Sequence, residues 1–273
     1  MGVSTRGAAV VTGAAGGLGL AIATALHQVG FEVLLTDLDE NDVAAAAKPL
    51  SGWSARLDVR YDQACAVVAE RAAERGGLAL WVNNAGVLST GPSWTHNAGV
   101  RRRVMETNAL GVMNGTLGAL DVMRRRGRGH IINVVSLAGL VAAPGQAVYA
   151  ASKHAALAFS IGTMADLRIA GAHGVHISCL CPDGIWTPML YDKLTDPGAA
   201  ASFTGTLLRP EAVAAELVRL VDRPRPVVAM PAWRGAQVRL LDAFPRLALP
   251  MARLMVAAGR AGQRRHARRL GGF

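Results

Sequence analysis

The sequence predicts an α/β fold: a single Rossmann-type, doubly wound domain built on a seven-stranded parallel sheet. Two observations lead to this prediction. Short apolar runs alternate with segments of helical periodicity, and the runs are continuously apolar, as in strands that are covered on both faces. A chain of 273 residues is long enough for one large domain of this kind. We therefore expect a main domain over residues 1–231, followed by a basic, helical C-terminal tail over residues 232–273.

The apolar runs and the helical segments follow one another without an obvious linker. Gly, Pro and Thr gather near residues 182–210, which predicts a loop after the sixth strand. The candidate strands are residues 8–12, 32–36, 53–57, 78–82, 130–135, 175–180 and 226–230. The candidate helices between them are near residues 17–28, 41–47, 62–74, 99–126, 150–171 and 210–222.

A glycine-rich stretch, TGAAGGLG (12–19), directly follows the first predicted strand and opens the first predicted helix. Gly13 permits a tight turn, while Gly17 and Gly19 let the backbone approach a pyrophosphate and let the helix pack on the strand. The N-terminus of that helix offers amide groups and a positive dipole to phosphates. We therefore expect a dinucleotide to bind here, with contacts from Gly13, Ala15, Gly16, Gly17, Leu18 and Gly19.

An acidic residue, Asp37, ends the second predicted strand, 20 residues after Gly17. Its carboxylate could accept hydrogen bonds from both hydroxyls of an adenosine ribose, and it would repel a 2′-phosphate. No Arg directly follows Asp37 or stands in the glycine stretch to neutralise such a phosphate, so the sequence favours NAD over NADP. The competing interpretation is an aspartate that caps a turn or a helix.

Two further strand ends carry candidate cofactor contacts. Asp58, followed by Val59, comes after the third predicted strand, where its carboxylate could hold the adenine amino group or cap the next helix. The NNAG stretch ends the fourth strand, beside the first, at the topological switch point where ligands bind. There we expect Ala85 and Gly86 to let the adenosine lie against the backbone, and Asn84 to fix the strand geometry through side-chain hydrogen bonds.

Tyr149 and Lys153 are scarce residues, one of three tyrosines and one of three lysines, and they stand four apart on one face of a predicted helix. Ser136 ends the fifth predicted strand 13 residues before the tyrosine, so a hydroxyl, a phenol and an ammonium reach the same edge of the sheet. Asn108 lies within a predicted helix, in TNALG. A partly buried tyrosine beside a snorkelling lysine is the alternative. The functional interpretation is a tyrosine acid/base, whose phenolate a nearby ammonium would stabilise. The pair of residues alone does not decide between the two.

Taken together, TGAAGGLG, NNAG, TNALG, the Ser136–Tyr149–Lys153 set and the Thr of PDGIWTPM resemble the classical short-chain dehydrogenase/reductase family. The resemblance covers residues 7 to about 231 and implies a dinucleotide-binding and catalytic domain there. It implies that Tyr149 is the catalytic acid/base, that Ser136 orients the substrate oxygen, and that Lys153 binds the nicotinamide ribose. It also implies that Asn108 supports a proton-relay water.

The loop after the sixth strand departs from the family's pattern. The family usually has Pro-Gly there, whereas this chain has PDG, with Asp183 between Pro182 and Gly184. The resemblance still implies cofactor contacts from Pro182, Ile185 and Thr187.

The activity that the resemblance implies is an NAD(P)-dependent oxidoreductase that interconverts an apolar secondary alcohol and its ketone by hydride transfer. A free tyrosine has a pKa near 10 and is a poor base at neutral pH. We expect the ammonium of Lys153 and the positive nicotinamide ring to lower the pKa of Tyr149. The alternative is a non-catalytic dinucleotide-binding or sensor protein on the same fold.

The residues expected around the catalytic set are apolar, which suits a hydrophobic alcohol or ketone as substrate, although about half of them could simply be core residues. No metal site is expected. The resemblance implies a homodimer or homotetramer, formed through the helices near 99–126 and 150–171. The expected substrate lining is Ala138, Leu140, Val141, Ala143, Val148, Trp186, Met189 and Leu190.

Positive charge is concentrated in the last quarter of the chain, where residues 209–273 hold thirteen Arg and four acidic residues. The tail mixes Leu, Met and Val with Arg, and we expect short helices broken at Pro245 and Pro250. The tail could touch an anionic membrane, helped by Trp233 and Phe244, or it could pack on its own domain or on a partner subunit. Without a recognised module, nucleic acid is not an expected partner.

Three cysteines without a disulfide framework favour a reducing compartment. The apolar start of the first strand leaves little room for a signal peptide, and no run of 18 apolar residues predicts a membrane span. We therefore expect a cytoplasmic protein whose contact with a membrane, if any, is peripheral.

Overall fold

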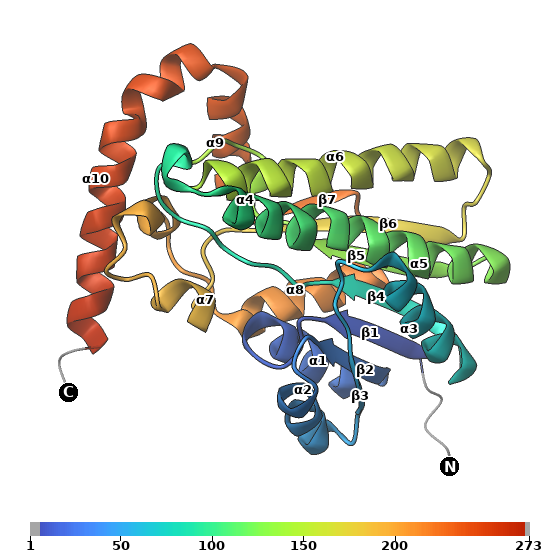
Figure 1. Cartoon of the computed structure of the whole chain (residues 1–273). Helices are drawn as coiled ribbons and strands as arrows, with labels where there is room; N and C mark the ends of the chain where they lie inside the picture. Colours follow the sequence, from blue (N-terminus) through green and yellow to red (C-terminus); the bar gives the residue numbers. More distant parts are fainter. Residues whose placement is uncertain (1–5, 271–273) are drawn as a thin grey trace.

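A sheet of seven parallel strands forms the centre of the computed structural model, which describes residues 6–270 (Figure 1). The strand order is β3-β2-β1-β4-β5-β6-β7. The chain adds β2 and β3 on one side of β1 and then β4 to β7 on the other side, so the topological switch point lies between β1 and β4. Residues 1–5 and 271–273 of the two expected segments lie outside the described residues. The strands are β1 (Ala8–Thr12), β2 (Glu32–Asp37), β3 (Trp53–Arg56), β4 (Leu78–Asn83), β5 (Gly129–Val134), β6 (Val175–Pro182) and β7 (Val227–Met230). The predicted fold class is confirmed.

Helices cover both faces of the sheet, as its continuously apolar strands require. On one face lie α1 (Gly17–Gln28), α2 (Glu40–Ala47) and α8 (Pro210–Asp222), and on the other lie α3 (Asp62–Glu74), α5 (Gly111–Arg126) and α6 (Ala147–Ile169) (Figure 1). The remaining α-helices are α4 (Ala98–Met105), α7 (Pro188–Tyr191), α9 (Ala232–Ala243) and α10 (Pro245–Leu270). The short η helices are η1 (Lys48–Leu50), η2 (Ser93–Thr95), η3 (Glu106–Leu110), η4 (Leu137–Gly139) and η5 (Pro197–Phe203).

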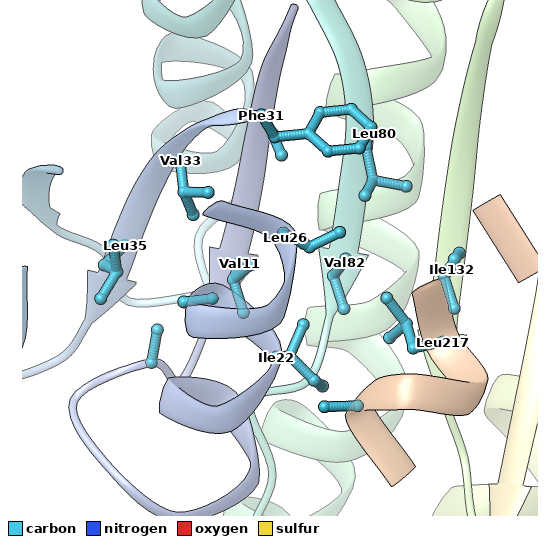
Figure 2. Close-up of a cluster of buried hydrophobic side chains, with 14 of the residues drawn as sticks. Val11, Ile22, Leu26, Phe31, Val33, Leu35, Leu80, Val82, Ile132 and Leu217 are labelled. Atoms are coloured by element: carbon cyan, nitrogen blue, oxygen red, sulfur yellow. The ribbon is translucent and has the colours of Figure 1, made fainter. Parts of the chain in front are cut away.

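The main core lies between the sheet and α1 (Figure 2). Ile22 and Leu26, one turn apart on α1, pack against Val11 and Val82 from the two central strands, while Leu217 comes from α8. Every residue of β1 is buried, so the strand that leads into the glycine stretch is fixed from both sides. The site at its carboxyl end therefore rests on a fully buried strand.

The helix expected over residues 99–126 is present but is not uniform. Residues Glu106–Leu110 form a π turn between α4 and α5, with Asn108 inside it. Two short helices, α7 and η5, occupy the region predicted as a loop near 182–210. Both begin with a proline, which is compatible with the first turn of a helix, and this explains how a segment rich in turn-forming residues forms helices.

The tail forms two helices, and the predicted break at Pro250 is wrong. The break at Pro245 is present, because α9 ends at Ala243 and α10 begins with that proline. Pro250 lies inside α10, which continues to Leu270. It removes one backbone donor near the start of the helix, and the rest of α10 is held by contacts with η5. In Figure 1 the ribbon of α10 curves over at its start and then runs down the side of the domain.

Candidate active site

One cleft of about 660 Å³ lies at the carboxyl ends of the parallel strands. Its lining follows the strand order, from Asp37 and Asp58 near the ends of β2 and β3 to Val238 of α9 and Met255 of α10. Its walls contain every residue predicted for catalysis or cofactor binding except Ala15 and Asn108. The sheet topology therefore brings together side chains that are far apart in the sequence.

The glycine stretch forms a tight turn between β1 and α1. Gly13 has a φ of +65°, and a Cβ atom there would lie 2.7 Å from the Cα atom of Ala85 on the neighbouring loop. A Cβ atom at Gly19 would overlap the carbonyl oxygen of Gly13. Gly16 precedes α1 in an extended conformation, and no side chain caps the helix. The amide groups of the first turn of α1 therefore remain available to an anion in the cleft.

The Asp37 carboxylate connects the glycine-rich turn to the end of β2. Its carboxylate accepts hydrogen bonds from the backbone amides of Ala15 (2.9 Å) and Leu38 (2.7 Å), while Asp39 is the residue that caps α2. Ala15 thus stands behind the cleft wall, bonded to Asp37, and does not line the cleft. Because two amides fix the carboxylate without consuming all of its acceptor positions, Asp37 can still accept hydrogen bonds from a ligand.

Asp58 is paired with a neighbouring arginine at the same end of the cleft. Its Oδ2 atom lies 2.5 Å from a guanidinium nitrogen of Arg60, and this bond lowers the pKa of Asp58. The side chain does not cap α3, because the N-cap residue of that helix is Tyr61. Both partners of the ion pair line the cleft.

Asn84 joins the ends of the two central strands. Its side-chain amide donates hydrogen bonds to the carbonyl oxygens of Thr12 and Gly13, both at 2.9 Å. The hydroxyl of Thr12 in turn accepts hydrogen bonds from the backbone amides of Asn84 and Ala85, both at 3.0 Å. These are the strand-fixing bonds that the sequence led us to expect.

Ser136, Tyr149 and Lys153 line the middle of the cleft. Lys153 Nζ donates a hydrogen bond to the carbonyl oxygen of Val134 (3.0 Å) and lies 5.9 Å from the centre of the Tyr149 ring. Burial lowers the pKa of Lys153 to about 8. Burial also raises the pKa of Tyr149 to about 12, although a hydrogen bond with Ser136 opposes part of that change.

In the protein alone, the pKa of Tyr149 therefore moves in the direction opposite to the one expected. The physical reason is desolvation, which disfavours the phenolate and also pushes the neighbouring lysine toward its neutral form. The ammonium by itself does not lower the pKa of the phenol here.

The buried lysine predicts a pH dependence of stability. Its folded-state pKa of about 8 is below the ordinary value of 10.5, so the unfolded chain binds more protons between these values. We expect the free energy of unfolding to rise by about 3 kcal/mol over this window, relative to a Lys153→Met variant. Urea unfolding of both proteins across the window measures the difference. Parallel curves would show that Lys153 is not desolvated in the folded protein.

Asn108 lies behind the cleft, inside the π turn, and its side-chain amide binds the loop after β4. The side chain accepts a hydrogen bond from the amide of Val87 and donates one to the carbonyl oxygen of the same residue, both at 2.8 Å. It also donates to Ser152 Oγ (3.0 Å), which donates to the carbonyl oxygen of Tyr149 (2.7 Å). Asn108 thereby connects the loop after β4 to the helix that carries Tyr149. π turns are frequent at functional sites.

The expected substrate lining is present in part. Five of its eight residues reach the cleft: Ala138, Val141, Ala143, Met189 and Leu190. Leu140 belongs to a buried core cluster, and Trp186 packs against Tyr191 and His266. Val148 does not reach the cleft either.

Several lining residues were missed in the sequence. Gln146 is buried and donates a hydrogen bond to Ser202 Oγ (2.6 Å), which links the catalytic helix to the segment between α7 and α8. Met255 comes from the tail helix α10, and Val238 from α9. No local pattern marks these residues, because they reach the cleft only through the packing of the tail on the domain.

Asp183, the departure from the family's pattern, forms an ion pair with Arg234 of α9. The Asp183 Oδ2 atom lies 2.9 Å from Arg234 Nε, and both side chains are largely buried. Arg234 also donates hydrogen bonds to Thr204 Oγ1 (3.0 Å) and Gln237 Oε1 (2.7 Å). The additional aspartate therefore anchors the C-terminal extension to the loop that ends β6.

Breaking this ion pair should be costly. We expect Arg234→Gln to lower the free energy of unfolding by about 3 kcal/mol, because Asp183 would be left with a buried, unpaired charge. Arg209→Gln is the matched control, since its pair with Glu211 is exposed and should contribute less than about 1 kcal/mol. Chemical unfolding of both variants measures the difference. Equal stabilities would mean that α9 is held by other contacts.

Comparison with known proteins identifies the family. Residues 7–197 match the short chain dehydrogenase family, which is most of the chain. The chain belongs to this family. A relative from Streptomyces exfoliatus, 1-deoxy-11-beta-hydroxypentalenate dehydrogenase, is 36% identical over 213 residues, which cover 75% of this chain and 76% of the relative.

A second relative of this short-chain dehydrogenase is the cyclopentanol dehydrogenase of a Comamonas species, 34% identical over 205 residues, 73% of this chain and 81% of the relative. A crystal structure of a short-chain dehydrogenase/reductase from Burkholderia phymatum in complex with NAD aligns with a TM-score of 0.80. It is 28% identical, and the alignment covers 90% of this chain and 96% of the other. The predictions of the family and of an oxidoreductase are confirmed, and nothing in these relatives supports the non-catalytic alternative.

Proposed function

We propose that this short-chain dehydrogenase uses NAD to interconvert an apolar secondary alcohol and its ketone. The observation that carries the proposal is the single cleft shared by the Ser136–Tyr149–Lys153 set, the glycine turn and Asp37. Apolar side chains at the other end of the cleft, among them Met189 and Met255, favour a hydrophobic substrate. A relative named for cyclopentanol supports an alcohol of this kind.

The chemistry of the cleft walls suits a nicotinamide dinucleotide. The uncapped N-terminus of α1 would bind the pyrophosphate, because no acidic residue stands in its first turn to repel it. Asp37 would accept hydrogen bonds from the adenosine ribose, and Lys153 would donate to the nicotinamide ribose. Residues Pro182, Ile185 and Thr187 line the cleft where the carboxamide would lie. When bound, the dinucleotide supplies the hydride donor or acceptor for the reaction.

The protein's own residues would then hold and move the proton. In the direction of oxidation, Tyr149 Oη takes the proton of the substrate hydroxyl, and the hydroxyl of Ser136 orients the substrate oxygen. Because burial raises the pKa of Tyr149 to about 12, an additional positive charge beside the phenol is needed to favour phenolate near neutral pH. The charge of an oxidised nicotinamide ring would meet that need. The hydrogen bonds of Asn108 would hold α6 and the loop after β4 in fixed positions next to a relay water.

The preference for NAD over NADP rests on Asp37. Its carboxylate is fixed by two amides at the adenosine end of the cleft, where it would repel a 2′-phosphate. Arg60, which also lines the cleft, is already paired with Asp58. The guanidinium of Arg60, which could otherwise neutralise a 2′-phosphate, is therefore occupied by the Asp58 carboxylate.

Purified protein, NAD and a panel of secondary alcohols of increasing apolar size test the proposed function. We expect reduced nicotinamide to accumulate, with kcat/KM rising as the apolar surface of the substrate grows. Activity only with small polar alcohols would contradict the substrate class. Activity with none of the panel, together with tight NAD binding, would favour a sensor.

We also propose a homo-oligomer formed through α5 and α6, whose exposed faces carry Leu117, Ile161 and Ile169. A reducing compartment such as the cytoplasm is supported by the three cysteines, which are all buried and free. Light scattering at micromolar concentration would distinguish this assembly from a monomer.

A further inference from the structure

Helices α9 and α10 form a hairpin at one edge of the domain (Figure 1). Residues 233–254, which we call its apex, comprise nearly all of α9, the turn at Phe244 and the first part of α10, and their exposed surface is rich in large apolar side chains. Leu249 is 72% exposed and Leu254 is 69% exposed, although aliphatic side chains of this size are usually buried. The exposed apolar residues of the apex are Trp233, Leu240, Phe244, Leu249, Met251 and Leu254.

The inner face of α10 packs against its own domain. Gln263 is buried and donates hydrogen bonds to the carbonyl oxygens of Lys193 (3.0 Å) and Asp196 (2.7 Å). The ring of His266 lies 5.3 Å from that of Trp186, and Gly259 packs directly on the carbonyl group of Ala200. The hairpin is therefore held in place, and the exposed residues of its apex are not those that fix it.

The charge around this apolar surface is mostly positive, since residues 233–254 hold four arginines and one acidic residue, Asp242. Residues 243–273 contain seven arginines and no acidic residue. Arg246, Arg253 and Arg260 are exposed, and within residues 6–270 none of the three takes part in an ion pair. A helical surface with exposed Leu, Phe and Trp side chains among arginines, here shared by α9 and α10, fits the interface of an anionic membrane.

We propose that the apex of the α9–α10 hairpin docks on an anionic lipid bilayer. A second copy of the chain fits this surface poorly, because two such faces would bring arginine against arginine. Nucleic acid would leave the apolar side chains without a partner. Within residues 6–270 no helix has the length and apolarity of a membrane span, so the contact is peripheral.

The position of the apex also places the membrane next to the substrate. Met255 lines the cleft, whereas the adjacent Leu254 faces outward. Docking would therefore bring the apolar end of the cleft to the lipid surface, where a lipophilic alcohol partitions. This last step rests on the proposed function; the membrane contact itself does not.

Vesicle flotation of the full chain tests the docking. We expect binding to vesicles of phosphatidylcholine with phosphatidylserine, weaker binding as salt is added, and little binding to phosphatidylcholine alone. A triple variant, Phe244→Ser with Leu249→Ser and Leu254→Ser, should bind at least about tenfold more weakly. A second triple variant, Arg246→Gln with Arg253→Gln and Arg260→Gln, should lose at least about tenfold as well.

The matched control carries Val67→Ser and Trp94→Ser, which remove exposed apolar side chains from other parts of the surface. It should bind the vesicles as the unaltered protein does. NAD binding and circular dichroism establish that every variant is folded, and a loss of NAD binding throughout would count against the proposed function only. The docking proposal is overturned if the full chain does not float at low salt, or if the apex variants float as well as the control. It is equally overturned if the apex variants abolish self-association or nucleic-acid binding while vesicle binding is unchanged.

Discussion

Tyr149→Phe is expected to lower kcat by at least about 10²–10⁴-fold, the usual contribution of a positioned acid/base. The substitution removes only the phenolic oxygen, and the ring can keep its place in the cleft beside Lys153. NAD affinity should therefore change by less than about tenfold, the value of one ordinary hydrogen bond. Steady-state kinetics and NAD titration by intrinsic fluorescence measure the two quantities separately.

Tyr191→Phe is the control for this experiment. Tyr191 is on α7 and packs on Trp186, so its variant tests the effect of losing a phenol outside the catalytic set. It should retain kcat within a few-fold of the unaltered enzyme. If the Tyr149 variant also retained its kcat, the acid/base would have to be another group, and the proposed mechanism would fail.

Asp37→Ala is expected to change the preference between the two dinucleotides. The loss of a charged acceptor of ribose hydroxyls should weaken NAD binding by about 10- to 100-fold, since such hydrogen bonds contribute about 1.5–3 kcal/mol. NADP should lose less or gain, because the repulsion of its 2′-phosphate disappears. The ratio of kcat/KM for NAD to that for NADP should therefore fall, by about 10- to 100-fold if NADP binding is unchanged and by more if it improves.

Asp39→Ala separates this effect from damage to the loop. Asp39 caps α2 through the amides of Asn41 and Asp42, so its loss should cost about 1 kcal/mol of stability and leave the cofactor ratio unchanged. A preference for NADP in the unaltered enzyme would mean that Asp37 does not exclude the 2′-phosphate. Equal shifts in the two variants would attribute the effect to the loop.

The fold was predictable because most of the strands are short apolar runs that end in a turn signal. Helices α1, α3 and α8 lie at their predicted bounds, and a glycine or a proline stands two residues after the end of each. The π turn at Glu106–Leu110 was not predictable, because no local pattern distinguishes it from a regular helix. At Pro250 a strong local signal predicted a helix break that is not present, because the packing of α10 on η5 stabilises the continuous helix.

The candidate site likewise contains residues that could be predicted from the sequence and residues that could not. Residues at strand ends and in the glycine turn could be predicted, since parallel topology alone brings them to one edge. The ion pair of Asp183 with Arg234 joins residues that are 51 positions apart, and Met255 reaches the cleft from the tail. Contacts of this kind depend on how the extension packs, which a single sequence does not encode locally. The raised pKa of Tyr149 in the protein alone could not be predicted, because burial cannot be read from the spacing to Lys153.

The π turn also sets the rotational phase of the helix that follows it. One residue of an α-helix corresponds to a rotation of about 100°, and a π turn takes up an extra residue without interrupting the helix. Deleting Ala109 would thus regularise the helix and leave the buried face of α5 against the sheet. Deleting Val112 from the regular helix would instead turn the residues after it by about 100°. Gly115, where any side chain would collide with Asn83, would no longer face that residue. Natural variation can therefore exchange residues in this helix far more readily than it can change its length.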